Sequence, residues 1–147
     1  MGFMDWVKKT SANLSDEVKR YKNRGFMEAV VAGCAMVAFA DGEATADEKS
    51  KMAGFVQRND ALSVFDTSDV VAAFDKCAKN FDFDFAIGKA EALKAISKLK
   101  KSSEESKLLV RVCCAIGAAD GNFDDDEKKV VREICKELGL DPGEFEL

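Results

Sequence analysis

The sequence predicts an all-α domain of about seven helices, and three observations carry that prediction. The 147 residues include a single proline, Pro142, and many alanine, lysine, glutamate and leucine residues, which favour helices. Apolar residues recur at helical spacing in several long segments. Residues 29–56 also resemble residues 108–135, and each copy has the pattern of a helical hairpin. We expect residues 1–147 to form one domain, with a core that needs no disulfide or metal.

The first half of the chain contains three of the expected helices. Residues 3–23 have the periodicity of an amphipathic helix, which Arg24-Gly25 ends. Its apolar side carries Phe3, Trp6 or Val7, Leu14, Val18 and Tyr21. Residues 26–40 are almost wholly apolar and are expected to form the central buried helix. A third helix follows Asp41-Gly42 and runs from about residue 46 to residue 58.

Two further helices are expected between residues 67 and 100. Thr67-Ser68-Asp69 supplies a helix start, and the helical periodicity continues to about residue 80. The stretch FDFDFAIG at 81–88 breaks this periodicity, and the fifth helix then runs from about residue 84 to residue 100. Phe and Asp alternate here for five residues, a run too short to favour a strand.

The last part of the chain contains the sixth and seventh helices. Ser102-Ser103-Glu104-Glu105 is a helix start, and the apolar run LLVRVCCAIGAA follows it. The seventh helix spans about 125–138, and Gly139 ends it. Pro142 favours one more short turn, because proline is well suited to a first helical position.

The internal repeat covers a buried helix, a tight acidic turn and an amphipathic helix. Eight of the 28 aligned positions in 29–56 and 108–135 are identical: Val31/Val110, Cys34/Cys113, Ala40/Ala119, Asp41/Asp120, Gly42/Gly121, Asp47/Asp126, Glu48/Glu127 and Lys49/Lys128. We therefore expect a pseudo-twofold arrangement of two hairpins, in which the two buried helices pack together.

The net charge of −5 is concentrated in the two acidic turns. Residues 41–48 and 120–127 hold nine acids and no base: Asp41, Glu43, Asp47, Glu48, Asp120, Asp124, Asp125, Asp126 and Glu127. The other 131 residues hold 18 acids and 22 bases. The acidity is therefore local, and it marks the turns as the first candidates for a functional site.

Cysteine and histidine usage restricts the chemistry. The five cysteines are odd in number, lie in apolar stretches and form no C-x-x-C pair: Cys34, Cys77, Cys113, Cys114 and Cys135. We expect them to be reduced core residues. Histidine is absent, which excludes histidine-based triads and the usual histidine sites for zinc, copper and nickel.

The start of the chain does not resemble a signal peptide, because charged residues interrupt its apolar residues from Asp5 onward. No apolar run approaches the ~18–20 residues of a membrane span. We therefore expect a cytoplasmic protein.

Helix capping is one explanation for the acidic turns. Gly42 and Gly121 suit the left-handed residue that often closes a helix. Thr45–Glu48 and Asp124–Glu127 both have the pattern of a capping box. Acids in a first helical turn also interact favourably with the helix dipole. On this reading, the turns only join helices.

Cation binding is the second explanation, and we favour it. Asp41 and Asp120 follow a helix end, where the dipole disfavours a carboxylate. The spacing D-G-x₅-E matches the last eight positions of an EF-hand loop. Apolar residues replace the first two acidic ligands of such a loop, namely Val37 and Phe39 in one copy and Ile116 and Ala118 in the other. Each turn is therefore at most half a site.

Two half-sites together would supply enough oxygen ligands for a hard cation, Ca²⁺ or Mg²⁺/Mn²⁺. This hypothesis has a geometric condition: Asp41, Glu48, Asp120 and Glu127 must converge. A third explanation is that the turns form a charged surface for a basic partner.

The paired A-D-G-x₅-E-K turns and the opening WVKKTSANLSDEVKRYKN resemble the TerB family of tellurite-resistance proteins, as does the length. The resemblance covers essentially the whole chain. It implies an all-helical fold and a place in a tellurite-resistance and stress-response system. It also implies metal-binding acids, carried over to Asp41, Glu48, Asp120 and Glu127, with Glu43, Asp47, Asp124, Asp125 and Asp126 as flanking candidates.

The resemblance further implies partners among other tellurite-resistance proteins, including calcium-binding and integral membrane components. It places the protein in membrane-associated complexes, which adds the inner face of the membrane to the expected cytoplasmic location. We expect a non-catalytic scaffold that binds or senses a divalent cation and acts through these partners.

Two alternatives remain from the residues themselves. A thiol-dependent enzyme that modifies tellurite would use Cys113-Cys114, but neighbouring helical residues point in different directions and no base lies nearby in sequence. A membrane-surface adaptor would use residues 1–24, an amphipathic segment with six bases and three acids. Nucleic-acid binding is disfavoured, because no basic patch contains interleaved aromatic residues.

Overall fold

The computed structural model describes residues 2–10, 13–42, 46, 47, 50, 53, 54, 62–118 and 123–147. These residues form helices and turns without a strand, which confirms the predicted all-α class. The α-helices are α1 (Phe3–Thr10), α2 (Leu14–Lys19), α3 (Arg24–Ala38), α5 (Thr67–Phe83), α6 (Phe85–Ser97), α7 (Ser103–Gly117) and α8 (Asp125–Leu138). Two short 3₁₀-helices are η2 (Leu62–Val64) and η3 (Pro142–Phe145).

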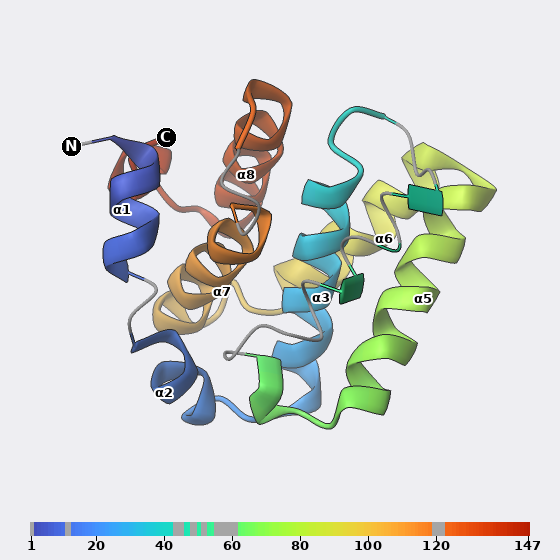
Figure 1. The fold of residues 1–147 in the computed structure, drawn as a ribbon, viewed down its shortest axis with the longest axis horizontal. Helices are drawn as coiled ribbons and strands as arrows, with labels where there is room; N and C mark the ends of the chain where they lie inside the picture. The colour runs from blue at the N-terminus through green and yellow to red at the C-terminus, as the bar shows by residue number, and fades with distance from the viewer. Residues whose placement is uncertain are drawn as a thin grey trace.

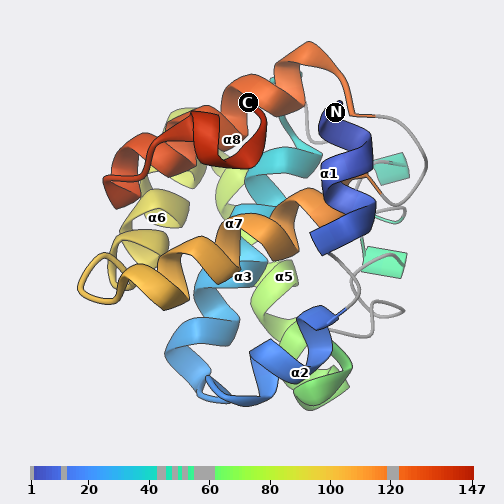
Figure 2. The same ribbon diagram turned by 90° about the vertical axis from the view of Figure 1, so that its left-hand side faces the viewer.

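Helix α3 lies at the centre of the fold (Figure 1). It packs against α5 and α6 on one side and against α7 and α8 on the other. Helices α1 and α2 lie over α7, and the two chain termini lie close together (Figure 2). The indole of Trp6 packs edge-on against the ring of Phe145, with centroids 5.7 Å apart, which joins the first helix to η3.

The prediction of one helix over residues 3–23 is wrong, because this segment forms the two helices α1 and α2. Thr10 ends the first helix and Asn13 is the N-cap of the second. Residues of these types favour helix ends over helix interiors, although the Asn13 side chain forms no cap hydrogen bond. The hydroxyl of Thr10 donates to the carbonyl of Val7 at 3.3 Å. The break allows both short helices to bury their apolar faces on α7.

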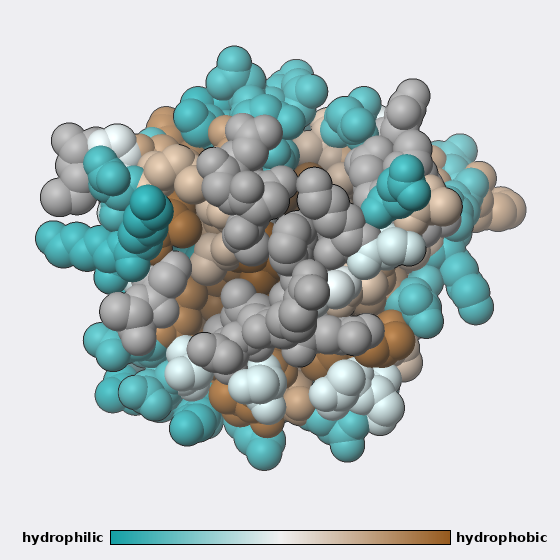
Figure 3. Space-filling view, viewed as in Figure 1, coloured by the Kyte–Doolittle hydropathy of each residue, from teal (hydrophilic) through white to brown (hydrophobic). Residues whose placement is uncertain are grey.

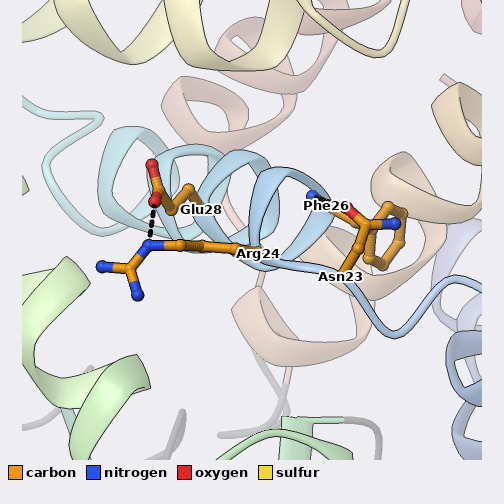
Figure 4. Close-up of polar contacts among 4 residues, drawn as sticks. All are labelled: Asn23, Arg24, Phe26 and Glu28. Carbon is orange, nitrogen blue, oxygen red and sulfur yellow. Dashed lines mark hydrogen bonds and ion pairs between the residues drawn. The ribbon is translucent and has the colours of Figure 1, made fainter.

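The central helix α3 is confirmed close to the expected residues 26–40. Its N-cap is Asn23, whose side-chain oxygen accepts a hydrogen bond from the backbone N–H of Phe26 at 2.8 Å. The guanidinium of Arg24 donates to the carboxylate of Glu28 at 2.9 Å, one turn along the helix. Figure 4 shows this pair on the opposite side of the helix start from the Phe26 ring.

Helices α5 and α6 are confirmed, and the break between them is a single residue. Asp84 is both the C-cap of α5 and the N-cap of α6. Its carboxylate accepts a hydrogen bond from the backbone N–H of Ile87 at 3.1 Å. The other residues of the FDFDF stretch are helical. Helix α5 therefore continues three residues beyond the expected residue 80.

The C-terminal elements also match the prediction. Helix α8 covers the expected residues, and Gly139 closes it in the left-handed conformation, with φ 71°. Pro142 begins η3, the expected extra turn. The short helix η2 was not predicted from the sequence.

The two repeat helices α3 and α7 pack directly together, as predicted. A Cβ atom added to Gly33 would lie 2.6 Å from the sulfur of Cys113, so the Cys113 side chain packs directly against the backbone of α3 at this point. Both helices contribute fully buried residues to the core. In Figure 3, hydrophilic residues gather at the outline of the face and hydrophobic residues show nearer its middle. None of the described helices is both long and apolar enough to span a membrane.

Candidate acidic site

The first acidic turn begins where α3 ends. The C-cap residue is Phe39, and Gly42 follows in the left-handed conformation, with φ 89°, as predicted. The N–H of Gly42 donates to the carbonyl of Phe39 at 3.0 Å, which closes a tight turn. Asp41 is exposed at the tip of this turn. The sequence therefore builds a carboxylate-bearing bend directly on the end of the most buried helix.

The rest of the first turn is described only in part. Asp47 is helical and exposed. The predicted ligand Glu48, the flanking Glu43 and the predicted cap Thr45 lie outside the described residues. The capping box expected for this hairpin therefore remains a prediction.

The second acidic turn leads into α8 through a complete capping box, as predicted. The carboxylate of Asp124 accepts from the N–H of Glu127 at 2.8 Å. In return, Oε1 of Glu127 accepts from the N–H of Asp124 at 3.0 Å. Asp125 and Asp126 are exposed in the first turn of the helix, where the dipole favours negative charge. The predicted ligand Asp120 and Gly121 lie outside the described residues.

An aromatic anchor fixes the entry to α8. The buried ring of Phe123 lies against Gly117, where an added Cβ would be 2.6 Å from the ring. The same ring packs on Phe3 of α1 with centroids 4.8 Å apart. The ammonium of Lys128 lies 5.5 Å from the Phe3 ring, a favourable cation–π arrangement. This anchor was not predicted from the sequence, because the residue that usually supplies its apolar partner, four positions after the N-cap, is Lys128 here.

Convergence of the four predicted ligands stays a prediction, because two of them, Glu48 and Asp120, lie outside the described residues. Among the residues that are described, no three acidic or cysteine side chains are grouped so that they could hold a metal ion. The pseudo-twofold relation of the hairpins also stays a prediction, since the second helix of the first hairpin is described at only a few positions.

The five cysteines are free, and four of them are buried. A hydrogen bond with Cys34, together with burial, holds the pKa of Cys113 well above its ordinary value. Burial raises the pKa of Cys114 as well. Burial raises the pKa of the half-buried Cys77 to about 11, and that of Cys135 to about 12. Thiolates, the reactive form, are therefore disfavoured at all four positions at neutral pH.

The apolar side of the N-terminal segment is used in packing. Phe3 and Val7 of α1 and Leu14 and Val18 of α2 are buried in the core. Trp6 packs against the same core and is half-buried. These side chains face the protein, so the outward surface of the segment is its charged one.

These features define a class of protein: a small all-helical domain whose two repeat helices end in acidic turns. Comparison with known proteins identifies the family within this class. The family model described as "Tellurite resistance protein TerB" matches residues 27–147. The tellurium resistance protein TerB of Alcaligenes sp is 42% identical over 116 residues, which cover 76% of this chain and 95% of the relative.

The chain therefore belongs to the TerB family of tellurite-resistance proteins. No solved structure matches it.

Proposed function

We propose that this protein is a non-catalytic scaffold of a tellurite-resistance system, and that its two acidic turns together bind a divalent cation, Ca²⁺ or Mg²⁺/Mn²⁺. The family and the name of the relative support the place in tellurium resistance. The resemblance supports partners among other proteins of such a system, including calcium-binding and membrane components.

The observation that carries the cation proposal is the equivalence of the two helices that precede the turns. Helices α3 and α7 both have 15 residues and occupy aligned positions of the repeat. Asp41 and Asp120 each follow the last residue of their helix by three positions. The two helices also pack against each other, so both acidic turns follow one packed pair of helices in the sequence.

The charge pattern gives the turns a preference for a hard cation. Asp124, Asp125 and Asp126 are exposed together at the N-cap and first turn of α8, and Asp120 precedes Asp124 by four positions in the sequence. Carboxylates that lie close together repel one another, and a bound cation relieves that repulsion. Carboxylate oxygens select Ca²⁺, Mg²⁺ or Mn²⁺ over softer metals.

Calorimetric titration of the folded protein with each of these ions tests the proposal. The Tm should rise with ion concentration, since a ligand present at 100 times its Kd stabilises the native state by about 2.7 kcal/mol. The double variant Asp41→Asn with Asp120→Asn should lose this response. The matched control, Asp69→Asn with Asp75→Asn, removes the same charge from exposed positions of α5 and should keep it. If no ion produces heat or a Tm shift, the turns are helix caps alone.

The thiol environment supports a non-catalytic role. The raised pKa values of Cys113 and Cys114 disfavour the thiolates that tellurite chemistry would need. Variants with alanine at both positions should retain the resistance phenotype, provided that circular dichroism shows them folded. Loss of resistance in a folded variant would instead favour a thiol-dependent enzyme that modifies tellurite.

A membrane-surface adaptor is the alternative function, with peripheral contact through residues 1–24. Because the apolar face of α1 is buried in the core, contact with a membrane would depend on the basic residues of α1 and α2. Sedimentation with anionic liposomes tests it on the whole chain: Lys8→Gln with Lys9→Gln should reduce binding, whereas Lys100→Gln with Lys101→Gln should not. Equal sedimentation of both variants would rule out this mode of contact.

A further inference from the structure

A groove lies between the first half of α3 and the helices α5 and α6, at the opposite end of α3 from its acidic turn. Its volume is about 420 Å³. Pockets for small molecules typically occupy about 300–1,000 Å³ and combine an apolar lining with a few polar groups. The groove has the size of such a site, and its lining is divided about equally between small apolar residues and polar ones.

The floor of the groove consists of small side chains. Ala32, Gly88 and Ala92 are buried there, with Ala73 and Ala95 half-buried beside them. An added Cβ at Gly88 would lie 2.7 Å from the backbone of α5, so this glycine keeps α6 close to α5. The small residues leave an apolar hollow that a compact hydrocarbon body can fill.

The rim of the groove is basic. Lys76, Lys94 and Lys98 are exposed on it, and none of them forms an ion pair in the described part of the chain. Lys94 and Lys98 stand one helical turn apart, where like charges repel. The fourth base, Arg24, is paired with Glu28 (Figure 4). Glu91 is the other acid of the lining, so positive charge is in excess.

We infer that this groove binds a small organic anion, with a carboxylate or phosphate group on the lysine rim and an apolar body on the alanine–glycine floor. The excess positive charge selects an anion, and the hollow selects a ligand with a hydrocarbon part. The inference uses none of the acidic-turn residues and is independent of the proposed cation site.

Cys77 provides a reporter inside the groove. It lines the groove and is half-buried, whereas the other four cysteines are buried. Iodoacetamide should therefore modify Cys77 first in the folded protein. Because the pKa of this thiol is raised to about 11, the reaction is best followed at alkaline pH. Mass spectrometry after proteolysis identifies the modified cysteine.

Decanoate and decyl phosphate are the probes. Each should slow modification of Cys77 in a saturable way, by about tenfold when the probe is at nine times its Kd. The ratio of their affinities shows whether a carboxylate or a phosphate is preferred. Decanol is a control that lacks the charge, and acetate and inorganic phosphate are controls that lack the hydrocarbon chain. All three should protect Cys77 only weakly.

The triple variant Lys76→Gln, Lys94→Gln, Lys98→Gln should weaken probe binding by about tenfold, the combined effect of three exposed charge interactions. Lys79→Gln, Lys100→Gln, Lys101→Gln carries the same change in net charge at exposed positions outside the groove and should bind as the parent does. Titration calorimetry on Cys77→Ser checks binding without the reporter.

Four results would overturn the inference: equal protection by decanol, equal protection by inorganic phosphate, equal affinity of the two triple variants, or no saturable binding. Protection by anionic vesicles or by an acidic peptide, without protection by the monomeric probes, would likewise reject a small-molecule site in favour of a docking surface.

Discussion

The two repeat helices are built alike but are buried to different extents. In α3 and α7 the N-cap side chain, Asn23 or Ser102, accepts a hydrogen bond from the N–H three residues later. The helices then end at aligned residues with the same backbone bonds at the C-cap. Eleven of the 15 residues of α3 are buried, but nine of those of α7.

Three aligned positions are buried in α3 but not in α7, and two of these three lie on the same side of the helix. Ala32 and Met36 of α3 are buried, whereas the aligned residues of α7, Arg111 and Ala115, are half-exposed. Helices α5 and α6 cover α3, whereas the short helices α1 and α2 cover part of α7. The two copies of the repeat therefore share their helix caps and the contact between α3 and α7. The helices that pack on each copy determine which other aligned residues differ in burial.

The largest expected effect concerns the aromatic residues at the helix ends. Phe39 is fully buried at the end of α3 and packs on Phe81, with centroids 5.2 Å apart. Phe39→Ala should lower the free energy of unfolding by about 3–5 kcal/mol, because it leaves a large cavity. The aligned residue of α7 is Ala118, and Phe123 supplies the aromatic ring there instead.

Phe123→Ala is the matched variant for this comparison. It should cost less than Phe39→Ala, since Phe123 lies nearer the surface, beside the N-terminal helix. Urea unfolding followed by circular dichroism measures both. An equal or larger loss for Phe123→Ala would show that the two helix ends are equally buried in solution.

The next largest effect concerns the contact between the two helices. Gly33→Ala places a Cβ 2.6 Å from the sulfur of Cys113. Overpacking of this kind typically costs about 1–3 kcal/mol, which exceeds the gain of about 0.8–1 kcal/mol in helix propensity. We expect a net loss of about 1 kcal/mol in the free energy of unfolding, measured in urea.

Cys113→Ala provides the test of that contact. In the double variant the sulfur is absent, so the added methyl group should fit and only the gain in helix propensity should remain, which gives a coupling between the two changes of about 2 kcal/mol. Additive effects would mean that the helices do not meet at Gly33.

Much of this fold could be predicted from local sequence signals. Helix starts at Ser102 and Asp124 and the helix end at Gly139 each depend on one side chain or on one left-handed residue. Periodicity also identified α3 as the buried helix. The division into α1 and α2 was not predicted, because the apolar periodicity continues from one helix into the other and the local preferences of Thr10 and Asn13 are weak signals beside it.

The candidate site was less accessible to sequence reasoning. The capping box of Asp124 and Glu127 is a local feature and was predicted. Convergence of carboxylates from two hairpins depends on long-range packing, which spacing does not specify. The basic groove was missed for the same reason, since Lys76 and Lys98 belong to separate helices that meet only in the folded chain.

A smaller effect compares the starts of the second helices of the two hairpins. Asp124→Ala removes the N-cap of α8 and should lower the free energy of unfolding by about 1 kcal/mol. Asp124→Asn keeps a capping oxygen and should cost little. Thr45→Ala changes the aligned residue of the first hairpin, and a similar loss measured in urea would indicate the same cap there. If Asp124→Asn costs as much as Asp124→Ala, charge rather than capping is responsible.

The smallest expected effect concerns the side on which α3 and α7 differ. Nη1 of Arg111 lies 3.0 Å from Oε2 of Glu17, and this ion pair ties α2 to α7. The two side chains are 28% and 34% exposed, so water screens their attraction in part, although Oε2 of Glu17 is itself buried. A double-mutant cycle with Arg111→Ala and Glu17→Gln should give a coupling of about 0.5 kcal/mol that decreases with added salt.

Arg111→Ala reproduces at this position the alanine that α3 carries as Ala32. If the helices packed on α3 and α7 determine which residue is favoured at this position, Arg111→Ala should lower the free energy of unfolding. The substitution leaves the Glu17 carboxylate without its counter-charge. A neutral or stabilising result would mean that α2 does not require a base on α7. The difference between Ala32 and Arg111 would then not result from the different neighbours of α3 and α7.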